Sequence, residues 1–353
     1  MRPAWRDEAS PDLVGVPTMI SAEERAYLHW LTRCAWQDAG HVLEVGPWLG
    51  GSTLCLAAGM RARGALARHR LHAVDNFLWR PFMEERAALG LRPGDSFEAR
   101  FRANLRGYAD LVTVHTASLP DEAIPGDPEA AAQRDGADGE RPLFAWEARE
   151  RIEILFVDGA KSWRGMRHLL LAVGASLQPG TLLVCQDFKY WGCYWVPMIL
   201  GSFCDALEIV HVVRAGDTVS FRLRAPLAPA ALAALPADVR ASDPEQALAA
   251  LERMRRALRD AGDVLGAHTL ALSRVKFLAH RGDLDAACRA FECSQAGWPL
   301  FARPGQLERA RRYLLATRGC SVPERRALAL AARARRLAAR ARGGARRIAA
   351  LVL

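Results

Sequence analysis

The sequence lacks the features that mark several common classes of protein. It has eight cysteines among 353 residues, but no CxxC pair and no spacing typical of a zinc site. It has no uninterrupted apolar run of membrane-spanning length, because the best candidate, 168–184, is broken by a proline and two glycines. The first twelve residues are charged and lack the apolar stretch of a signal peptide. We therefore expect a soluble, cytoplasmic protein with reduced cysteines.

Acidic residues are missing from the C-terminal end of the chain. Residues 325–353 hold nine of the 48 basic residues and no acidic residue. The rest of the chain therefore has 39 basic and 39 acidic residues, and the formal charge of +9 comes from this C-terminal segment. We predict a basic helix or tail over 323–353. Such a segment binds anionic lipid at the inner membrane surface, binds nucleic acid, or is simply a solvated end. The sequence leaves these three open, with nucleic acid the least favoured.

Short apolar strands alternate with helical patterns through the first 225 residues. We expect strands at 41–45, 71–75, 111–115, 152–158 and 182–187, with helices at 22–37, 52–63, 97–108 and 163–176. This alternation predicts right-handed βαβ units and a mostly parallel sheet, hence an α/β fold. Two further extended runs, 207–213 and 218–223, predict a closing hairpin.

Changes in composition divide the chain. Residues 121–150 are rich in Pro, Gly, Ala and acids, which predicts an exposed insertion or loop inside the domain formed by 1–225. From 226 to 322 Ala, Leu and Arg dominate after several prolines, which predicts an α-helical region with helices at 245–261, 265–280, 284–292 and 305–317. A partial likeness to a tetratricopeptide repeat lacks the 34-residue period, so a small helical bundle is the preferred interpretation.

The most informative segment is 42–53, which reads VLEVGPWLGGST. A buried strand that ends in glycines and opens into a helix lets the backbone approach a ligand, although a tight turn without a ligand is the alternative. Asp75 lies 29 residues after Gly46, where an acid in such folds accepts ribose hydroxyls. The spacing differs from GxGxxG, and Glu44 suits a positively charged methionine group better than a pyrophosphate. A dehydrogenase is therefore the second choice.

These residues resemble the class I S-adenosylmethionine-dependent methyltransferases, whose first motif reads acid-x-Gly-x-x-x-Gly. More narrowly, the chain is similar to the macrocin-type sugar O-methyltransferases and their uncharacterised bacterial relatives, through EVGPWLGGS at 44–52, FVDG at 156–159, and LQPG at 177–180 leading to QDF at 186–188. The resemblance implies a doubly wound, seven-stranded, Rossmann-like sheet. It also implies an S-adenosylmethionine site built from Glu44, Gly46, Trp48, Gly50, Ser52 and Asp75.

Asp158 and Asp187 each end a predicted parallel strand, so both are expected at the carboxyl edge of the sheet. In metal-dependent relatives, acids at these strand ends coordinate magnesium, which activates a substrate hydroxyl. In this chain Lys161 stands where the relatives usually have a histidine. Gln186 and Asp187 stand where the metal-binding relatives have two consecutive acids. A magnesium ion held by Asp158 and Asp187 therefore stays an open alternative. Without metal, Asp158 or a desolvated Lys161 takes the hydroxyl proton, unless Lys161 pairs with Asp158 or binds an anionic acceptor.

The sequence thus predicts methyl transfer to a hydroxyl of a saccharide or small molecule, with Asp158, Lys161 and Asp187 at the acceptor side. The aromatic cluster at 188–195 suits stacking on a sugar, although core packing explains at least half of it. Trp79 and Phe82 are candidates for a lid or for ordinary packing. Two other functions remain open: a catalytically inactive cofactor-binding or scaffolding protein, and an RNA methyltransferase that uses the basic tail.

Overall fold

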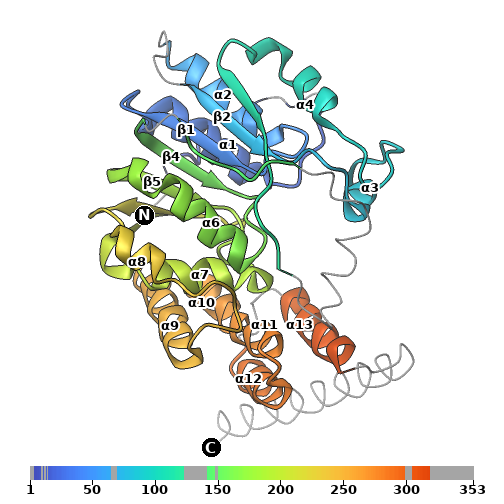
Figure 1. Ribbon diagram of the computed structural model, residues 1–353, viewed down its shortest axis with the longest axis vertical. Coiled ribbons are helices and arrows are strands. Elements are labelled where there is room, and N and C mark those ends of the chain that lie inside the picture. Colours follow the sequence, from blue (N-terminus) through green and yellow to red (C-terminus); the bar gives the residue numbers. More distant parts are fainter. Residues whose placement is uncertain are drawn as a thin grey trace, which may run out of the picture.

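The structure is a computed structural model that describes residues 4–298 and 304–318, except 9–10, 12, 14, 65–69, 123–140 and 148–149. Within these ranges one seven-stranded sheet has the order β3-β2-β1-β4-β5-β7-β6 (Figure 1). Its strands are β1 (His41–Val45), β2 (Leu71–Asp75), β3 (Val112–Thr116), β4 (Ile152–Val157), β5 (Leu177–Cys185), β6 (Leu207–Val212) and β7 (Val219–Leu223). The first five strands run parallel, and β7 runs antiparallel to both its neighbours. The predicted α/β fold with its closing hairpin is confirmed.

Helices cover both faces of the sheet, as the βαβ pattern requires. One face packs against α1 (Ala22–Trp30), α2 (Gly51–Ala62) and α4 (Glu98–Asn104), and the other packs against α6 (Trp163–Val173) and α7 (Trp195–Gly201). A further helix, α3 (Pro81–Ala87), follows β2 along the chain. Neighbouring strand residues enter opposite cores: Val42 belongs to the first face and Leu43 to the second. The chain is therefore doubly wound.

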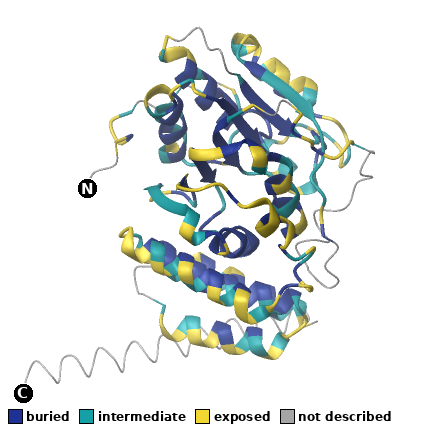
Figure 2. Ribbon diagram, turned by 60° about the vertical axis from the view of Figure 1, so that its left-hand side comes forward, coloured by how far each residue is buried: buried dark blue, intermediate teal, exposed yellow. Residues whose placement is uncertain are grey.

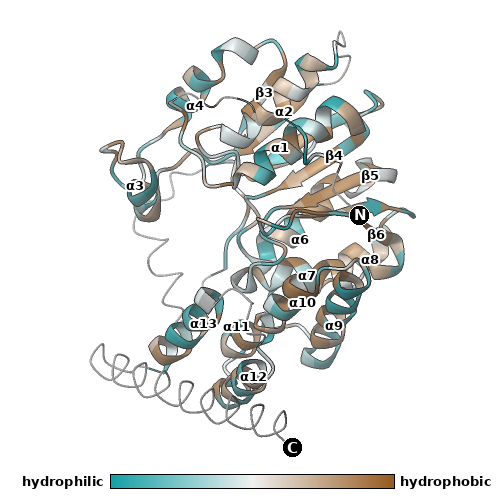
Figure 3. Ribbon diagram, turned by 180° about the vertical axis from the view of Figure 1, so that it is seen from behind, coloured by the Kyte–Doolittle hydropathy of each residue, from teal (hydrophilic) through white to brown (hydrophobic). Residues whose placement is uncertain are grey.

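The centre of the sheet is formed by strands that are apolar along most of their length. Every residue of β1 and β4 is buried, whereas the residues of the edge strand β6 are only half-buried. The buried centre of the sheet is visible in the colouring by burial (Figure 2), and the apolar colouring of β4 and β5 in Figure 3 agrees with it. Strands buried on both faces are rich in Val, Ile and Leu, and this enrichment is why the sequence located β1 and β4 well.

Strand β5 differs from its predicted form. It begins at Leu177 rather than at residue 182, so the segment 178–180 lies inside the strand instead of before it. The pairing with β4 shifts there, because Ile152 pairs with Leu177 but Ile154 pairs with Leu182. Gly180 supplies the left-handed backbone conformation (φ 93°) that this irregularity requires.

The C-terminal region is helical, as predicted. It contains α8 (Pro229–Ala233), α9 (Pro244–Asp260), α10 (Val264–Ala271), α11 (Ser273–His280), α12 (Leu284–Ala296) and α13 (Pro304–Thr317). One apolar core runs from β5 through α7 into α8 to α11, so these helices share a core with the sheet, whereas α12 and α13 pack in a separate cluster with α11 and Trp191. No helix in the described ranges is long and apolar enough to cross a membrane. The predicted basic helix over 323–353 and most of the predicted insertion at 121–150 lie outside the described residues.

Candidate functional site

The first part of the site is a buried carboxylate beneath the glycine turn. Glu44 is the last residue but one of β1, has no solvent exposure, and accepts a hydrogen bond from the hydroxyl of Ser52, in the first turn of α2. Its second oxygen, Oε2, has no hydrogen-bond partner among the described residues. Burial raises the pKa of Glu44 to about 7, against the lowering effect of the Ser52 hydrogen bond. A buried carboxylate with one unpartnered oxygen is costly, and a cationic ligand would relieve that cost.

The glycines of the turn are required by the packing of the protein itself. Gly46 has a φ of 87°, and a Cβ at this position would lie 2.4 Å from the backbone nitrogen of Gly159. Gly50 has a φ of 93°, and a Cβ there would lie 3.3 Å from the ring of Phe101. The loop after β1 therefore lies directly on the loop after β4, and the Asp158 N–H donates to Val45 O at 2.8 Å. The glycines thus bring two halves of the site together.

Asp75 ends β2 beside this turn and is half-buried. Its Oδ1 accepts a 2.9 Å hydrogen bond from the N–H of Phe77. Burial raises the pKa of Asp75 to about 6, while hydrogen bonds from the backbone of Phe77 and Trp48 lower it. Trp48, predicted as a cofactor residue, is buried and stacks on Trp79 with ring centroids 6.5 Å apart. Trp79 is fully enclosed, so it packs rather than forming a lid.

The second part of the site is an ion triad formed by Asp158, Lys161 and Asp187. Asp158 follows β4 and Asp187 follows β5, and the Gln186 N–H donates to Val157 O at 3.0 Å, which ties these strand ends together. Lys161 Nζ donates to Asp158 Oδ1 at 2.7 Å and also to Asp187 Oδ2. The three residues predicted for the acceptor side are therefore brought together.

The charges of the triad are strongly coupled. Burial raises the pKa of Asp158, and the neighbouring Asp187 raises it further, whereas Lys161 lowers it. Burial alone would lower the pKa of Lys161, but Asp158 and Asp187 together raise it well above its ordinary value. Lys161 is thus held as a cation, and of the roles left open by the sequence the structure favours pairing over action as a base.

The aromatic cluster after β5 faces mainly inward. Phe188, Trp191, Tyr194 and Trp195 are buried, and only Tyr190 is half-buried. Tyr194 Oη lies 2.9 Å from His280 Nδ1 on α11. Trp191 packs edge-on against Tyr313 of α13. Trp191 and Tyr194 therefore join the helical region to the sheet. Of the five aromatic residues, Tyr190 is the one with exposed surface to offer an acceptor.

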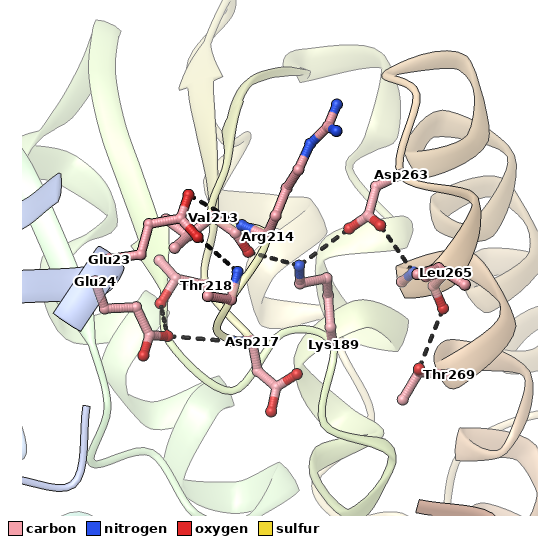
Figure 4. A network of polar contacts seen from close by, with 12 residues as sticks. Glu23, Glu24, Lys189, Val213, Arg214, Asp217, Thr218, Asp263, Leu265 and Thr269 are labelled. Atoms are coloured by element: carbon pink, nitrogen blue, oxygen red, sulfur yellow. Dashed lines mark hydrogen bonds and ion pairs between the residues drawn. The ribbon is translucent and has the colours of Figure 1, made fainter. Parts of the chain in front are cut away.

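Sequence reasoning missed a polar network between α1 and the turn that joins β6 and β7 (Figure 4). Glu24 of α1 accepts hydrogen bonds from the Thr218 hydroxyl at 2.7 Å and the Asp217 N–H at 3.2 Å, at the turn between β6 and β7. Its charge also raises the pKa of Asp158. The signal for this residue was present, because Ser21 and Glu24 have the spacing of a capping box and form one.

The comparison with known families covers both parts of the site. Residues 43–188 match the family model described as a methyltransferase domain, from β1 to the residue after Asp187. The match contains Glu44, the glycine turn, Asp75 and the whole ion triad. No curated protein is significantly similar to this chain.

Several solved structures are remotely similar. The O-methyltransferase NovP is 18% identical, with 59% of this chain and 82% of that chain covered and a TM-score of 0.39. The SAH-bound Podospora anserina methyltransferase PaMTH1 is 14% identical, with 59% and 80% covered and a TM-score of 0.35. CalS11, a TDP-rhamnose 3'-O-methyltransferase, is 12% identical, with 55% and 75% covered and a TM-score of 0.33.

Proposed function

We propose that this chain carries a class I methyltransferase domain and transfers a methyl group from S-adenosylmethionine to a hydroxyl of a saccharide or other small molecule. The match of residues 43–188 to a methyltransferase domain supports this proposal. One observation carries the proposal: Glu44, Asp75, Asp158 and Asp187 lie on or directly after the neighbouring strands β1, β2, β4 and β5. Ligands bind at the carboxyl ends of parallel strands in open α/β sheets. A cofactor at β1 and β2 would thus face an acceptor at β4 and β5.

The cofactor half is supported by the chemistry of its acids. The unpartnered Oε2 of Glu44 would receive the α-ammonium group of the methionine moiety. The carboxylate of Asp75, at the tip of β2, would accept the two ribose hydroxyls. Gly46, Gly50 and Ser52 would hold the turn in which these acids lie, with Trp48 behind it. S-adenosylmethionine supplies the electrophilic methyl group.

The acceptor half would position a hydroxyl and remove its proton. As the oxygen attacks the methyl carbon, a C–O bond forms and the C–S bond breaks, with the electron pair staying on sulfur. The hydroxyl proton goes to the carboxylate of Asp158, because the ammonium of Lys161 has no lone pair to accept it. Positioning of the two reactants supplies most of the rate enhancement in such in-line transfers.

The saccharide acceptor rests on the resemblance of the motifs at 44–52, 156–159 and 177–188 to sugar O-methyltransferases. Tyr190, three residues after Asp187, offers an aromatic surface that could stack on a sugar ring. A peripheral membrane contact through 325–353 would suit lipid-linked glycans as acceptors.

Transfer of labelled methyl groups from S-adenosylmethionine to a panel of sugars, nucleotide sugars, phenols and RNA tests the proposal. Labelled saccharide or small-molecule product supports it, and Asp158→Asn should then lower kcat by about 100-fold or more. Labelled RNA, lost on deletion of 325–353, would favour the RNA methyltransferase instead. Tight cofactor binding without transfer to any acceptor would favour the scaffolding role.

A further inference from the structure

Lys161 Nζ stands between the two carboxylates that end β4 and β5. Its ammonium lies 2.7 Å from Asp158 Oδ1 and is also hydrogen-bonded to Asp187 Oδ2. The side chains of Asp158 and Asp187 are 22% and 23% exposed, and that of Lys161 is 47% exposed. One cation therefore bridges both strand ends and still has a face directed to solvent.

The position of Lys161 is fixed by the structure around it. The carbonyl of the preceding residue, Ala160, accepts a 2.8 Å hydrogen bond from the buried indole of Trp195. The following residue, Ser162, caps α6 by accepting from the Gly165 N–H at 2.9 Å. The lysine thus leaves the backbone between an anchored carbonyl and a helix start, which directs its side chain to the two carboxylates.

The same two carboxylates were the predicted ligands of magnesium, and the residues present do not fit that ion. A divalent cation needs negatively charged or neutral oxygen ligands around it. Both carboxylates are already engaged by an ammonium group, whose charge would repel a second cation at this distance. The described residues also contain no group of three or more His, Cys, Asp and Glu side chains that could hold a metal ion.

We propose that Lys161 is a built-in replacement for the divalent cation, so that the acceptor site works without metal. This inference rests on the proposed function, because it assigns the ammonium a role toward the acceptor hydroxyl. Two of its three N–H bonds engage Asp158 and Asp187, and the third would orient the acceptor oxygen. Two carboxylates and one ammonium leave a net charge of −1, so one carboxylate stays available for the hydroxyl proton.

Binding of Mn²⁺ to the full-length protein, followed by electron paramagnetic resonance, tests this inference without any assay of methyl transfer. Wild-type protein should bind Mn²⁺ weakly, whereas Lys161→Ala should bind it about tenfold or more tightly, because the two carboxylates are released. Lys161→Arg keeps the positive charge and is the matched control, so it should bind as weakly as wild type. Adding Asp187→Asn to Lys161→Ala should remove the new site.

Two further experiments make the outcome decisive. Lys161→Met replaces Lys161→Ala if circular dichroism shows that the alanine variant does not fold. Where methyl transfer is observed, chelation by EDTA should leave the wild-type rate unchanged. Tight Mn²⁺ binding by wild type, equal binding by wild type and Lys161→Ala, or loss of the wild-type rate in EDTA would overturn the inference. Absence of cofactor binding would instead defeat the proposed function, and the Mn²⁺ comparison would still stand on its own.

Discussion

The ammonium of Lys189 donates a 3.0 Å hydrogen bond to the carboxylate of Asp263, and both side chains are almost fully buried, at 4% and 11% exposed. Lys189 follows β5 and also donates to Val213 O at 2.7 Å, whereas Asp263 caps α10 by accepting from the Gly266 N–H. This ion pair therefore joins the segment after β5, the β6–β7 hairpin and the helical region (Figure 4).

Lys189→Met should lower the free energy of unfolding by about 3 kcal/mol, because it leaves Asp263 as a buried charge without its partner. Chemical denaturation of the two proteins measures the difference. Arg224→Ala, which breaks the exposed pair with Glu208, is the control and should leave the denaturation midpoint almost unchanged. Equal effects of the two substitutions would mean that the buried pair does not hold the sheet and the helical region together.

Gly46→Ala should destabilise the protein by about 2 kcal/mol or more, because the new Cβ meets the backbone of Gly159. Gly64 provides a matched control, since it also has a positive φ (73°), but a Cβ added there would have no atom of the described residues within 4 Å. Gly64→Ala should therefore cost only the conformational strain of about 1 kcal/mol. Thermal or chemical unfolding measures the loss of stability in both variants. The difference between the two losses is the cost of the clash between the loops after β1 and β4.

Glu44→Gln should weaken binding of S-adenosylmethionine by about tenfold, because it removes the charge that attracts the cofactor ammonium while keeping the shape of the side chain. Isothermal titration measures the affinity. Unchanged affinity would show that Glu44 only holds Ser52 and α2 in place.

The affinity of wild type for S-adenosylmethionine should rise between about pH 6 and about pH 8. The pKa of Glu44 is raised to about 7, so the carboxyl is mostly protonated at the lower pH and ionised at the higher one. The ionised form attracts the ammonium group, and cofactor binding therefore releases a proton. Glu44→Gln should flatten this dependence, and an equally steep pH profile in that variant would assign it to another group.

Tyr194→Phe should lower the free energy of unfolding by about 1 kcal/mol, because it removes one buried hydrogen bond to His280 Nδ1 without opening a cavity. The cofactor affinity should stay at the wild-type value. A large loss of cofactor binding with unchanged stability would instead place Tyr194 in the site rather than at the junction with α11.

Local patterns were enough to predict the sheet and the acids at its carboxyl edge. Mostly apolar runs indicated β1 and β4, and Asp75, Asp158 and Asp187 were expected at one edge because parallel strands bring their carboxyl ends together. The first residues of β5, from Leu177, were not predicted, since a glycine with positive φ inside a strand looks the same in sequence as one between elements.

Contacts between distant residues could not be read in the same way. Lys161 and Asp187 are 26 positions apart, and only the folded sheet shows that the lysine satisfies both acids. Likewise, the aromatic residues after β5 resemble a stacking surface in sequence, whereas in the structure α11 packs on Tyr194 and α13 packs on Trp191, from far along the chain. Burial of Glu44 was predictable from the strand, but its unpartnered oxygen was not.

Isothermal titration of the purified protein with S-adenosylmethionine, and separately with NAD, tests the central claim most directly. We expect saturable binding of S-adenosylmethionine, unaffected by magnesium, and no binding of NAD. Binding of NAD alone would contradict the cofactor assignment. Binding of neither would mean that the glycine turn serves only to pack the loops after β1 and β4.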